Sequence, residues 1–581
     1  MLEKLNPQQR EVVETRSPCL AIACPGAGKT GTIATKAAVL LADPKVMVGA
    51  VTFSREAALE LRSRILNLAG DGVKKRLLAG TFHSLAYKQV LGANSGPKIE
   101  IANEGDRFGL LDRVINELGL DLKVDAAIKI IENIKTDFGK VATGTPEEVL
   151  YKAYQAALKR NGKIDFQDMM GLAVAGMQAG TIKPYPVHHL LVDEFQDTDG
   201  PQFRWVSMHG KAGSIVTVVG DDDQSIYGFR SALGVRGMDA ITEELQAQQI
   251  VLGINYRCRA EILTAADKVI RHNTLRIEKQ LYADKGQGGT IESRRYKDEY
   301  DEATAAVTYL KPKLEANAEC AILARTNRIL DAVESVCRSY GVPYYRASGK
   351  SILNRPEGAV FCNLLEIIQG VKKTGLDAVL GMSGMGTADL TKLHEEMGAT
   401  LVTRSKAELQ NIGLDESTAT AYRNFMKRLG EWKDLYSRNL QGLVLAGVGE
   451  WMLNTARSDQ AQRSIQATHN VLSRLSGPFT DRIAFLRRDN NEPTPDALVL
   501  TTMHSAKGRE WDHVWIVRAE DGVTPDDKSP ESEERRLFYV GMTRAKETLQ
   551  ISSTKKGAVS RFVRESEIPA VQNPDLDEPA Q

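Results

Sequence analysis

The sequence lacks several features that would place it outside the ordinary cytoplasmic proteins. Its six cysteines form no CxxC pair and its nine histidines form no spaced cluster beside them, so we expect reduced thiols and no structural zinc. It has no apolar run near the ~20 residues that span a membrane, and residues 1–10 (MLEKLNPQQR) contain no hydrophobic signal core. The sequence therefore predicts a cytoplasmic protein with no membrane partner.

An excess of charge of either sign is also missing, because 75 Lys and Arg residues balance 75 Asp and Glu residues. Composition alone therefore gives no support for a nucleic-acid partner, which usually requires a basic footprint, and any basic surface must be local. The 42% of hydrophobic and 6% of aromatic residues are ordinary for a globular protein and exclude disordered and fibrous classes. At 581 residues, the chain has room for about four domain-sized units.

Short apolar runs alternate with helical patterns in the first part of the chain. Predicted strands at 20–23, 46–53 and 190–193 are each followed by a predicted helix, at 30–41, 56–68 and 202–209. Repetition of strand, loop and helix predicts an α/β fold with a parallel sheet covered by helices. A second region of this kind begins near Ile254, resumes at 497–501 and closes with a helix at 533–545 and a strand at 548–552.

Two stretches, 104–160 and about 371–490, have helical patterns alone and interrupt these regions. The end of the chain is acidic, since no basic residue follows Arg564, and we expect it to be a disordered tail. The predicted organisation is therefore two α/β domains, each with a helical insertion, and a tail. The boundaries are 1–90 and 160–255 for the first domain, 91–159 for its insertion, 256–370 and 491–562 for the second domain, 371–490 for its insertion, and 563–581 for the tail.

A glycine-rich loop follows the first predicted strand and opens the first predicted helix. This is the context that a phosphate-binding P-loop requires, because small residues let backbone N–H groups surround the phosphates at a helix N-terminus. The lysine would reach the β- and γ-phosphates of a nucleotide, and the threonine hydroxyl would bind Mg²⁺. The residues of the loop are Ala23, Cys24, Pro25, Gly26, Ala27, Gly28, Lys29 and Thr30.

Two adjacent carboxylates end the strand at 190–193. Neighbouring side chains of a strand point to opposite faces, so Asp193 and Glu194 can serve one site only if the strand stops there. In combination with the P-loop, the sequence predicts that Asp193 holds Mg²⁺ and that Glu194 polarises the attacking water.

The order of motifs resembles the UvrD/Rep/PcrA group of superfamily 1 DNA helicases. The matching segments are AxxGxGKT, VDEFQDT, VGDDDQSIYGFRSA (219–232), INYR (254–257), TMHSAKGREW (502–511) and EERRLFYVGMTRA (533–545), together with LNPQQR (5–10), TFS (52–54) and GTFHS (80–84). The resemblance extends from residue 5 to about residue 552. It implies two RecA-like P-loop domains with parallel sheets, each carrying a helical insertion, which agrees with the organisation predicted from the pattern alone.

The resemblance also implies roles in ATP hydrolysis. Gln224 would sense the γ-phosphate, while Arg257 and Arg544 would reach from the second α/β domain into a cleft and stabilise the transferred phosphoryl group. Gln9 would read adenine, Tyr256 would stack on it, and Glu510 would accept a hydrogen bond from the ribose. ATP and Mg²⁺ are the implied cofactors.

Single-stranded nucleic acid is held by aromatic faces that stack on bases and by polar contacts to phosphates. Within the matched motifs, the residues expected to stack are Phe53, Tyr227 and Phe229. Those expected to contact the backbone of the nucleic acid are His83, Arg230 and His504. The family commonly has Trp where Phe229 stands, so a smaller stacking area is expected here. It commonly has Arg where Gly31 stands, a difference that bears on contacts to the nucleotide base.

The resemblance implies an ATP-dependent helicase that moves 3′ to 5′ on single-stranded DNA and separates duplex, in repair, replication or recombination. Its implied partners are single-stranded DNA and junctions of single- and double-stranded DNA. The alternative is a translocase that displaces proteins from single-stranded DNA without productive unwinding. The motifs do not separate these two functions, because both need every motif named above.

Overall fold

The computed structural model describes residues 2–94, 99–137, 139–349, 355–382, 384–398, 401–456, 459–487, 494 and 496–571. The chain forms two compact units, each described by itself below. The first unit combines Met1–Gly289 with Lys528–Thr543, and the second combines Thr290–Asp527 with Arg544–Gln581.

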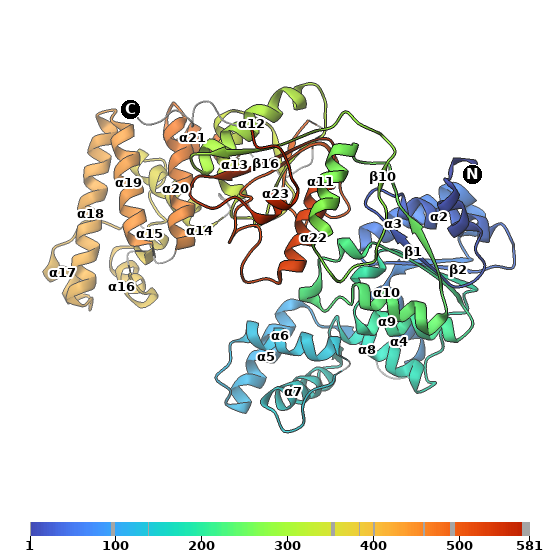
Figure 1. The fold of residues 1–581 in the computed structure, drawn as a ribbon. Helices are drawn as coiled ribbons and strands as arrows, with labels where there is room; N and C mark the ends of the chain where they lie inside the picture. Colours follow the sequence, from blue (N-terminus) through green and yellow to red (C-terminus); the bar gives the residue numbers. More distant parts are fainter. Residues whose placement is uncertain are drawn as a thin grey trace. The chain divides into compact units, whose positions relative to one another are not determined.

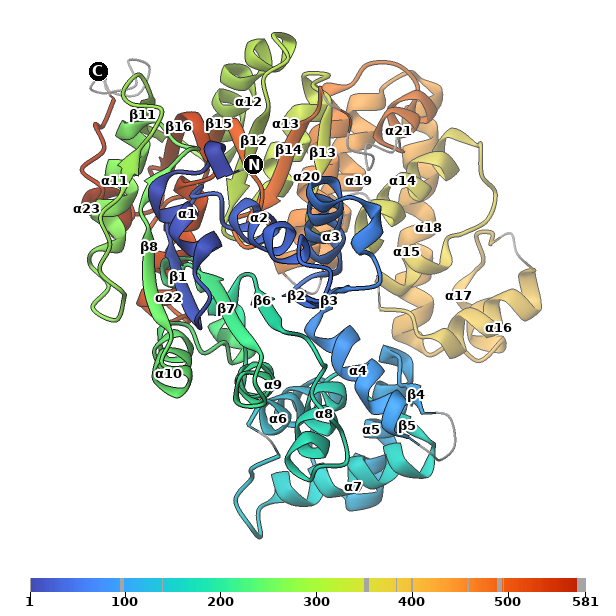
Figure 2. The same ribbon diagram turned by 90° about the vertical axis from the view of Figure 1, so that its right-hand side faces the viewer.

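A six-stranded parallel sheet forms the centre of the first unit (Figure 2). Both faces of the sheet are covered, so β1 and β2 are buried at every residue and read as continuous apolar runs, as is usual for a parallel sheet. In spatial order the strands are β3 (Leu77–Thr81), β2 (Val48–Thr52), β6 (His189–Val192), β7 (Ile215–Gly220), β1 (Cys19–Ala23) and β8 (Gln248–Leu252).

Alternate residues of each strand build two hydrophobic cores, one on each face of this sheet. Leu20 and Ile22 of β1 pack in a core with Phe82 and Trp205. Cys19, Ala21 and Ala23, on the other face of the strand, pack in a second core with Ile33. The helices around the sheet are α1 (Pro7–Glu14), α2 (Lys29–Leu41), α3 (Arg55–Ala69), α4 (Phe82–Ala93), α8 (Asp168–Gln178), α9 (Gly200–Lys211) and α10 (Val235–Leu245), with 3₁₀ turns η1 (Leu2–Lys4), η2 (Asp71–Val73), η3 (Phe195–Asp197), η4 (Asp222–Gln224) and η5 (Gly228–Arg230).

The helical insertion of the first unit is a separate lobe, in which α5, α6 and α7 lie side by side (Figure 1). Leu111, Ile131 and Tyr154 are fully buried in its own core. Its elements are β4 (Glu100–Ile101), α5 (Glu104–Leu118), α6 (Val124–Thr136), α7 (Pro146–Arg160) and β5 (Lys163–Ile164), with β4 and β5 paired in parallel.

The first unit is completed by segments that the predicted boundaries place in the second α/β domain. They follow β9 (Ile254–Asn255) and are α11 (Ala260–Ile270), β10 (Tyr282–Ala283) and the distant helix α22 (Glu531–Met542), which packs on α11. Residues 256–289 and 528–543 therefore lie in the first unit, which differs from the prediction. Hydrogen bonds to the P-loop, described below, explain why this part of the chain stays with the first sheet.

A second six-stranded parallel sheet forms the centre of the second unit, with β11 at one edge. The order is β11 (Thr290–Tyr296), β16 (Ala545–Thr554), β15 (Trp511–Ile516), β12 (Cys320–Ala324), β14 (Leu498–Thr502) and β13 (Tyr344–Arg346). Its flanking helices are α12 (Glu299–Glu315), α13 (Leu330–Ser339) and α23 (Arg561–Glu565). The predicted α/β class with parallel sheets is confirmed in both units.

The helical insertion of the second unit forms one hydrophobic core that runs from Phe361 to Leu486. This core begins within α14, before the predicted boundary at residue 371, because Phe361, Leu364 and Leu365 of that helix are fully buried in it. The helices are α14 (Pro356–Gln369), α15 (Asp377–Met382), α16 (Thr387–Met397), α17 (Lys406–Asn411), α18 (Glu416–Ser437), α19 (Gln441–Thr455), α20 (Asp459–Arg474) and α21 (Phe479–Arg487).

The predicted tail divides into two parts. Residues 563–571 are packed, because Val563 and Ile568 are buried and Ala570 pairs in parallel with Ser293 of β11. Residues 572–581 lie outside the described residues. All six cysteines are buried free thiols, as expected. Among the described helices, none has the length and apolar character of a membrane span.

A buried carboxyl group lies in the core of the second unit. Glu302 of α12 accepts hydrogen bonds from the Ser552 hydroxyl at 2.6 Å and from the Arg518 backbone N–H at 2.9 Å. Burial raises the pKa of Glu302 to about 7, with Arg518 acting to lower it and Glu520 acting to raise it. Its folded-state pKa thus lies above that of an unfolded glutamate, and the folded protein binds the proton more tightly.

This shift predicts a pH-dependent stability that depends on Glu302. The favourable contribution is complete below the unfolded pKa of about 4.3 and is lost as the pH rises through about 7, a change on the order of 3 kcal/mol. Glu302→Gln should therefore reduce the loss of thermal stability between pH 5 and pH 8, measured as the difference in Tm. Identical pH profiles for the parent and the variant would show that Glu302 does not carry this effect.

Candidate nucleotide and nucleic-acid site

The P-loop lies between β1 and α2 in the first unit. Gly26 and Gly28 have φ angles of 64° and 73°, in the left-handed region that glycine adopts without a steric penalty. Gly28 is the N-cap of α2, which begins at Lys29. The free backbone N–H groups of this helix end, with its partial positive charge, suit a bound phosphate group.

One segment, residues 255–257, packs closely against the P-loop. The Asn255 side chain donates to the Pro25 carbonyl at 2.6 Å, and the Tyr256 backbone N–H donates to the Gly26 carbonyl at 3.1 Å. A Cβ atom at Gly26 would lie only 2.7 Å from the Cβ of Arg257. The loop therefore needs glycine at residue 26 both for its backbone angle and for the room it leaves Arg257.

We predict that Gly26→Ala lowers stability and weakens nucleotide binding. The left-handed backbone costs about 1–2 kcal/mol for a residue with a Cβ, and the overlap with Arg257 adds to it. Gly31→Ala is the matched control, because its Cβ meets no atom within 4 Å and the residue lies inside α2, where alanine should stabilise by roughly 0.5–1 kcal/mol. Tm and the Kd for ATP distinguish the two; equal effects at both positions would contradict this account.

The two residues that end the P-loop contact the two carboxylates predicted to act with them. The Lys29 ammonium lies 3.0 Å from Glu194 Oε2, and the Thr30 hydroxyl donates to Asp193 Oδ2 at 2.8 Å. Burial opposes the charge of Lys29, but Glu194, Asp221 and Asp193 together raise the pKa of its ammonium. Burial, and next the Glu194 carboxylate, raise the pKa of Asp193 to about 6, with Lys29 acting to lower it.

The contact between Thr30 and Asp193 lies where the sequence predicts the Mg²⁺ site. A hydroxyl and a carboxylate oxygen side by side, from Thr30 and Asp193, are the hard oxygen ligands that Mg²⁺ prefers together with phosphate oxygens. The residues present therefore fit the ion. Bound there with a nucleotide, it would neutralise charge on the phosphates.

Glu194 is held in an unusual backbone conformation at the end of β6. Its φ angle is 54°, which turns the chain sharply after Asp193 and lets both carboxylates face one site. The Gln196 amide donates to Glu194 Oε2 at 2.6 Å and accepts from the Asp221 backbone N–H at 3.0 Å. Gln196 thus links two strand ends, a role that sequence reasoning missed although the residue lies within VDEFQDT.

Three consecutive aspartates follow β7 and surround one buried lysine. The Lys279 ammonium lies 2.7 Å from Asp221, 2.6 Å from Asp222 and 3.0 Å from Asp223, and all four side chains are fully buried. Although burial lowers it, the three carboxylates raise the pKa of Lys279 well above its ordinary value. The carboxylate oxygens lie close enough for a metal ion, but the Lys279 ammonium already contacts all three, so we interpret the cluster as an ion-pair network.

This network supports the residue predicted to sense the γ-phosphate. The Gln224 side chain donates to Asp221, whose other oxygen accepts from Lys279. Arg276 pairs with Asp223 at 2.8 Å. Sequence reasoning missed Lys279 and Arg276; the signal that could have found them is the run of three acidic residues, which needs cations if it is buried.

The residues expected to bind the base lie at the opening of the P-loop. The Gln9 amide donates to the Ala27 carbonyl at 3.0 Å, and its oxygen accepts from the Asn6 backbone N–H at 3.1 Å. Tyr256, which is 37% exposed, accepts a hydrogen bond from the Asn6 side chain at 2.8 Å. The two residues are thus brought to one edge of the loop, joined by Asn6, which sequence reasoning did not single out.

Arg257 belongs to the first unit rather than to the second α/β domain. Its backbone N–H donates to the Asn255 side chain at 2.9 Å, and its guanidinium donates to the Thr543 carbonyl at 3.2 Å. The Asn255 side chain also donates to the Pro25 carbonyl, so it connects the backbone of Arg257 to the P-loop. This anchoring explains why Arg257 lies beside the P-loop, with its Cβ facing Gly26.

The three aromatic residues expected to stack on bases form one cluster in the first unit. The rings of Phe53 and Tyr227 are nearly parallel, with centroids 5.9 Å apart, and Tyr227 meets Phe229 edge to face at 6.0 Å. Phe229 is 63% exposed, which is unusual for a large apolar side chain. The Arg230 side chain lies outside the described residues.

His83 lines a groove of about 540 Å³ at the ends of β3 and α3. Its ring lies against Phe166, with centroids 4.0 Å apart, and burial lowers its pKa to about 4, so it is neutral at physiological pH. Arg55 and Arg62 also line the groove and supply positive charge. Phe166, half exposed, is a further candidate for base contact that sequence reasoning missed.

The remaining predicted site residues belong to the second unit. Arg544 is buried, and its guanidinium donates to the Arg509 carbonyl at 3.2 Å. Glu510 is exposed beside Lys546, at 3.9 Å. His504 lies in the turn after β14, where its carbonyl accepts from the Lys507 backbone N–H. Glu510 and Arg544 directly precede the paired strands β15 and β16, so the structure brings these two residues together. His504 follows β14, at the opposite end of this parallel sheet.

Comparison with protein families identifies the class. The UvrD/REP helicase N-terminal domain matches residues 5–238, and the UvrD-like helicase C-terminal domain matches 250–378 and 459–556. The chain belongs to the UvrD/REP helicase family. It is an ATP-dependent DNA helicase with two RecA-like domains. The unmatched stretch 379–458 lies in the helical lobe of the second unit.

Individual relatives agree with this assignment over nearly the whole chain. The sequence is 30% identical to DNA helicase II of Salmonella typhimurium, with 95% of this chain and 84% of the relative covered. It is 30% identical to the ATP-dependent DNA helicase UvrD1 of Mycobacterium tuberculosis, covering 95% and 82%. It is 28% identical to the ATP-dependent DNA helicase PcrA of Leuconostoc citreum, covering 97% and 84%.

Proposed function

We propose that this enzyme moves 3′ to 5′ along single-stranded DNA, driven by hydrolysis of Mg²⁺-bound ATP, and separates duplex at junctions of single- and double-stranded DNA. Its place of action is the cytoplasm, in DNA repair, replication or recombination. Lys29 and Thr30 bind the nucleotide phosphates and the metal, Asp193 holds the metal and Glu194 activates water. The polarity is proposed from the resemblance of its motifs to the UvrD-like branch.

One short segment carries the main support for this proposal. Residues 221–230 follow β7 and hold Gln224, which is hydrogen-bonded to Asp221, and three to five residues later the aromatic residues Tyr227 and Phe229. The group expected to sense ATP and the groups expected to stack on bases are therefore joined by a few backbone bonds. A shift of this segment on hydrolysis would move the base-stacking rings directly.

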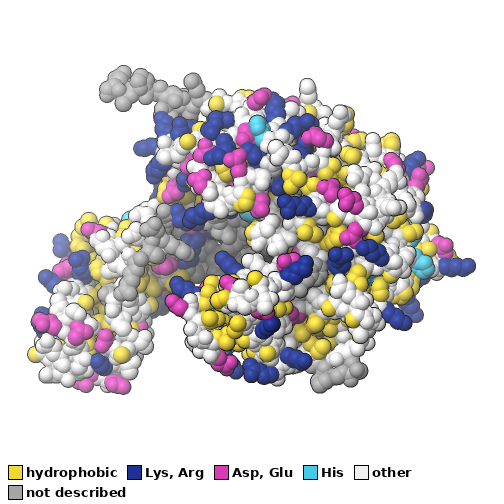
Figure 3. Space-filling view, turned by 60° about the horizontal axis from the view of Figure 1, so that its bottom comes forward, with side chains coloured by type: hydrophobic (Ala, Val, Ile, Leu, Met, Phe, Trp, Pro, Cys, Tyr) yellow, Lys and Arg dark blue, Asp and Glu magenta, His cyan; other side chains and the backbone are white. Residues whose placement is uncertain are grey.

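Local chemistry rather than net charge supports the DNA partner. On the face shown in Figure 3, Lys and Arg side chains are interspersed with Asp and Glu, which agrees with the net charge of zero. The aromatic cluster and the groove with Arg55, Arg62 and His83 supply stacking and phosphate contacts instead. Stacking on aromatic side chains is worth roughly 1–3 kcal/mol per base.

The test is unwinding of two matched DNA substrates, one duplex with a 3′ single-stranded tail and one with a 5′ tail. We expect ATP-dependent strand separation on the 3′-tailed duplex and much less on the 5′-tailed one, with no separation by Lys29→Ala. Preference for the 5′ tail would overturn the proposed polarity. ATP-driven removal of a protein block from single strands, without unwinding of either duplex, would establish the alternative translocase.

A further inference from the structure

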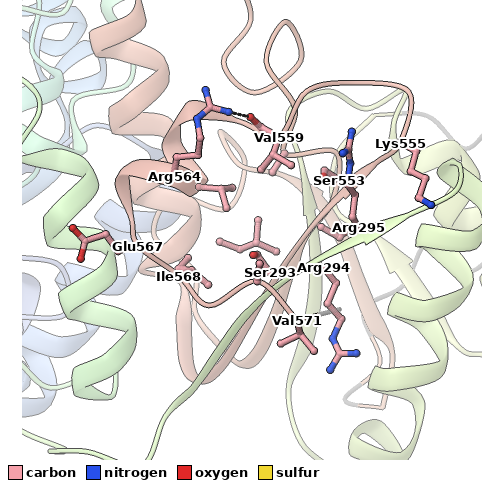
Figure 4. A pocket seen from close by; sticks show the side chains of 15 residues that line it. Ser293, Arg294, Arg295, Ser553, Lys555, Val559, Arg564, Glu567, Ile568 and Val571 are labelled. Carbon is pink, nitrogen blue, oxygen red and sulfur yellow. Dashed lines mark hydrogen bonds between the residues drawn. The ribbon is translucent and has the colours of Figure 1, made fainter. Parts of the chain in front are cut away.

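A pocket of about 530 Å³ lies on the second unit, between the edge of its sheet and α23 (Figure 4). The floor is apolar and is made by Ile551, Val559, Val563, Ile568 and Val571. A volume of this size is typical of sites that take a ligand. None of the residues predicted to act in ATP hydrolysis or DNA binding lines it.

The rim of the pocket is cationic. Arg294, Arg295, Lys555 and Arg564 line it together with the carboxylate Glu567, and Arg294 also pairs with Glu292 at 3.1 Å. Figure 4 shows Arg294 and Arg295 of β11 pointing to opposite sides of the strand, with Arg564 across the pocket. Arg564 also pairs with Asp521 at 3.1 Å, and the Arg295 guanidinium donates to the Gly557 carbonyl at 2.6 Å. An apolar floor under a cationic rim suits a segment that combines an apolar side chain with carboxylates.

The chain itself runs along the wall of this pocket as it leaves the described region. The Ser293 backbone N–H donates to the Pro569 carbonyl at 3.0 Å, and the Val571 backbone N–H donates to the Ser293 carbonyl at 2.9 Å. Ala570 thus forms a parallel β-bridge with Ser293 at the edge of β11, and Ala570 and Val571 line the pocket.

The sequence that follows Val571 has the composition that the pocket suits. Residues 572–581 read QNPDLDEPAQ, with one large apolar residue, Leu576, among Asp575, Asp577 and Glu578, and with no Lys or Arg. Leu576 is five residues from Val571, so an extended chain reaches roughly 17 Å, enough to enter a pocket that Val571 itself lines.

We infer that this pocket docks the acidic segment 572–581 of the same chain, with Leu576 on the apolar floor and the carboxylates on the cationic rim. A short tether supplies the segment at an effective concentration of about millimolar, so a modest intrinsic affinity suffices.

The test uses the full chain, a chain ending at Val571, and a fluorescent peptide of sequence QNPDLDEPAQ. Fluorescence anisotropy should show the peptide binding to the shortened chain and binding at least roughly tenfold more weakly to the full chain, where the tethered segment competes. A peptide in which Leu576 is replaced by Asp should lose binding. Equal ATP hydrolysis by the two chains confirms that both are folded.

Rim variants of the shortened chain test the charge requirement. Arg294→Glu with Lys555→Glu should weaken peptide binding at least roughly tenfold, whereas Lys311→Glu, an exposed residue of α12 that does not line the pocket, should leave it unchanged. The inference is overturned if the peptide fails to bind the shortened chain at about millimolar concentration, the level that a tether supplies. Equal binding to both chains, or equal effects of rim and control variants, would also overturn it.

Discussion

Glu194→Gln should leave ATP binding intact and lower DNA-stimulated ATP hydrolysis by roughly 10²- to 10⁴-fold. The amide has the shape of the carboxylate but cannot take a proton from the attacking water. In the parent, Glu194 Oε2 accepts a hydrogen bond from Gln196 at 2.6 Å and lies 3.0 Å from the Lys29 ammonium. The amide oxygen of the variant can make both contacts. The P-loop geometry should therefore survive the substitution.

The measurement is single-turnover hydrolysis together with the Kd for ATP. Glu60→Gln is the matched control, since Glu60 is an exposed residue of α3 that pairs with its helical neighbour Arg64, and this variant should hydrolyse ATP at the parent rate. If Glu194→Gln retains turnover near that of the parent, another group activates the water. If instead it loses ATP binding, Glu194 acts chiefly as the ion-pair partner of Lys29.

Lys279→Met should destabilise the first unit by about 3–5 kcal/mol, the range seen when one partner is removed from a buried ion pair. Three carboxylates within 3.0 Å of the ammonium would lose their common cation. Among the described residues, Asp223 alone would keep a second cation, Arg276. Because Asp221 also holds Gln224, the affinity for ATP should fall together with stability.

Chemical unfolding of the parent, the variant and a control checks this expectation. Lys75→Met removes an exposed lysine from the same unit and should change stability little. Addition of Asp222→Asn to Lys279→Met should recover part of the loss, because it removes one of the carboxylates left without a cation. A single variant as stable as the parent, or a double variant less stable than the single one, would refute the ion-pair interpretation.

The local parts of this fold could be predicted from the sequence, whereas its long-range parts could not. The strand at Cys19–Ala23 and the helix at Lys29–Leu41 follow from an apolar run, a glycine-rich loop and a helical pattern within 25 residues. The placement of α22 beside α11 depends on pairing between distant segments, for which the pattern of either segment alone has no signal. For the same reason, the predicted domains and the compact units differ at residues 256–289.

The candidate site shows the same division. Lys29 and Glu194 could be predicted as partners because both follow strand ends of one parallel sheet, where active residues gather. The roles of Gln196, Asn255 and Lys279 could not be predicted. Each depends on a hydrogen-bond or ion-pair partner that the fold brings from another segment of the chain. Lys279 in particular stands in a stretch without regular helix or strand, and only the buried aspartates of another segment give it a role.

The completion of the first unit by α22 has a consequence for how the protein is made. The helix supplies Leu537, Phe538, Tyr539 and Val540 to the interior, yet it is encoded roughly 240 residues after Gly289, the end of the rest of that unit. At about 5–20 residues per second, the ribosome needs roughly 10 to 50 s to bridge that interval. During this time the apolar face of α11 is open, so nascent chains stalled before residue 531 should be the ones that bind chaperones or aggregate.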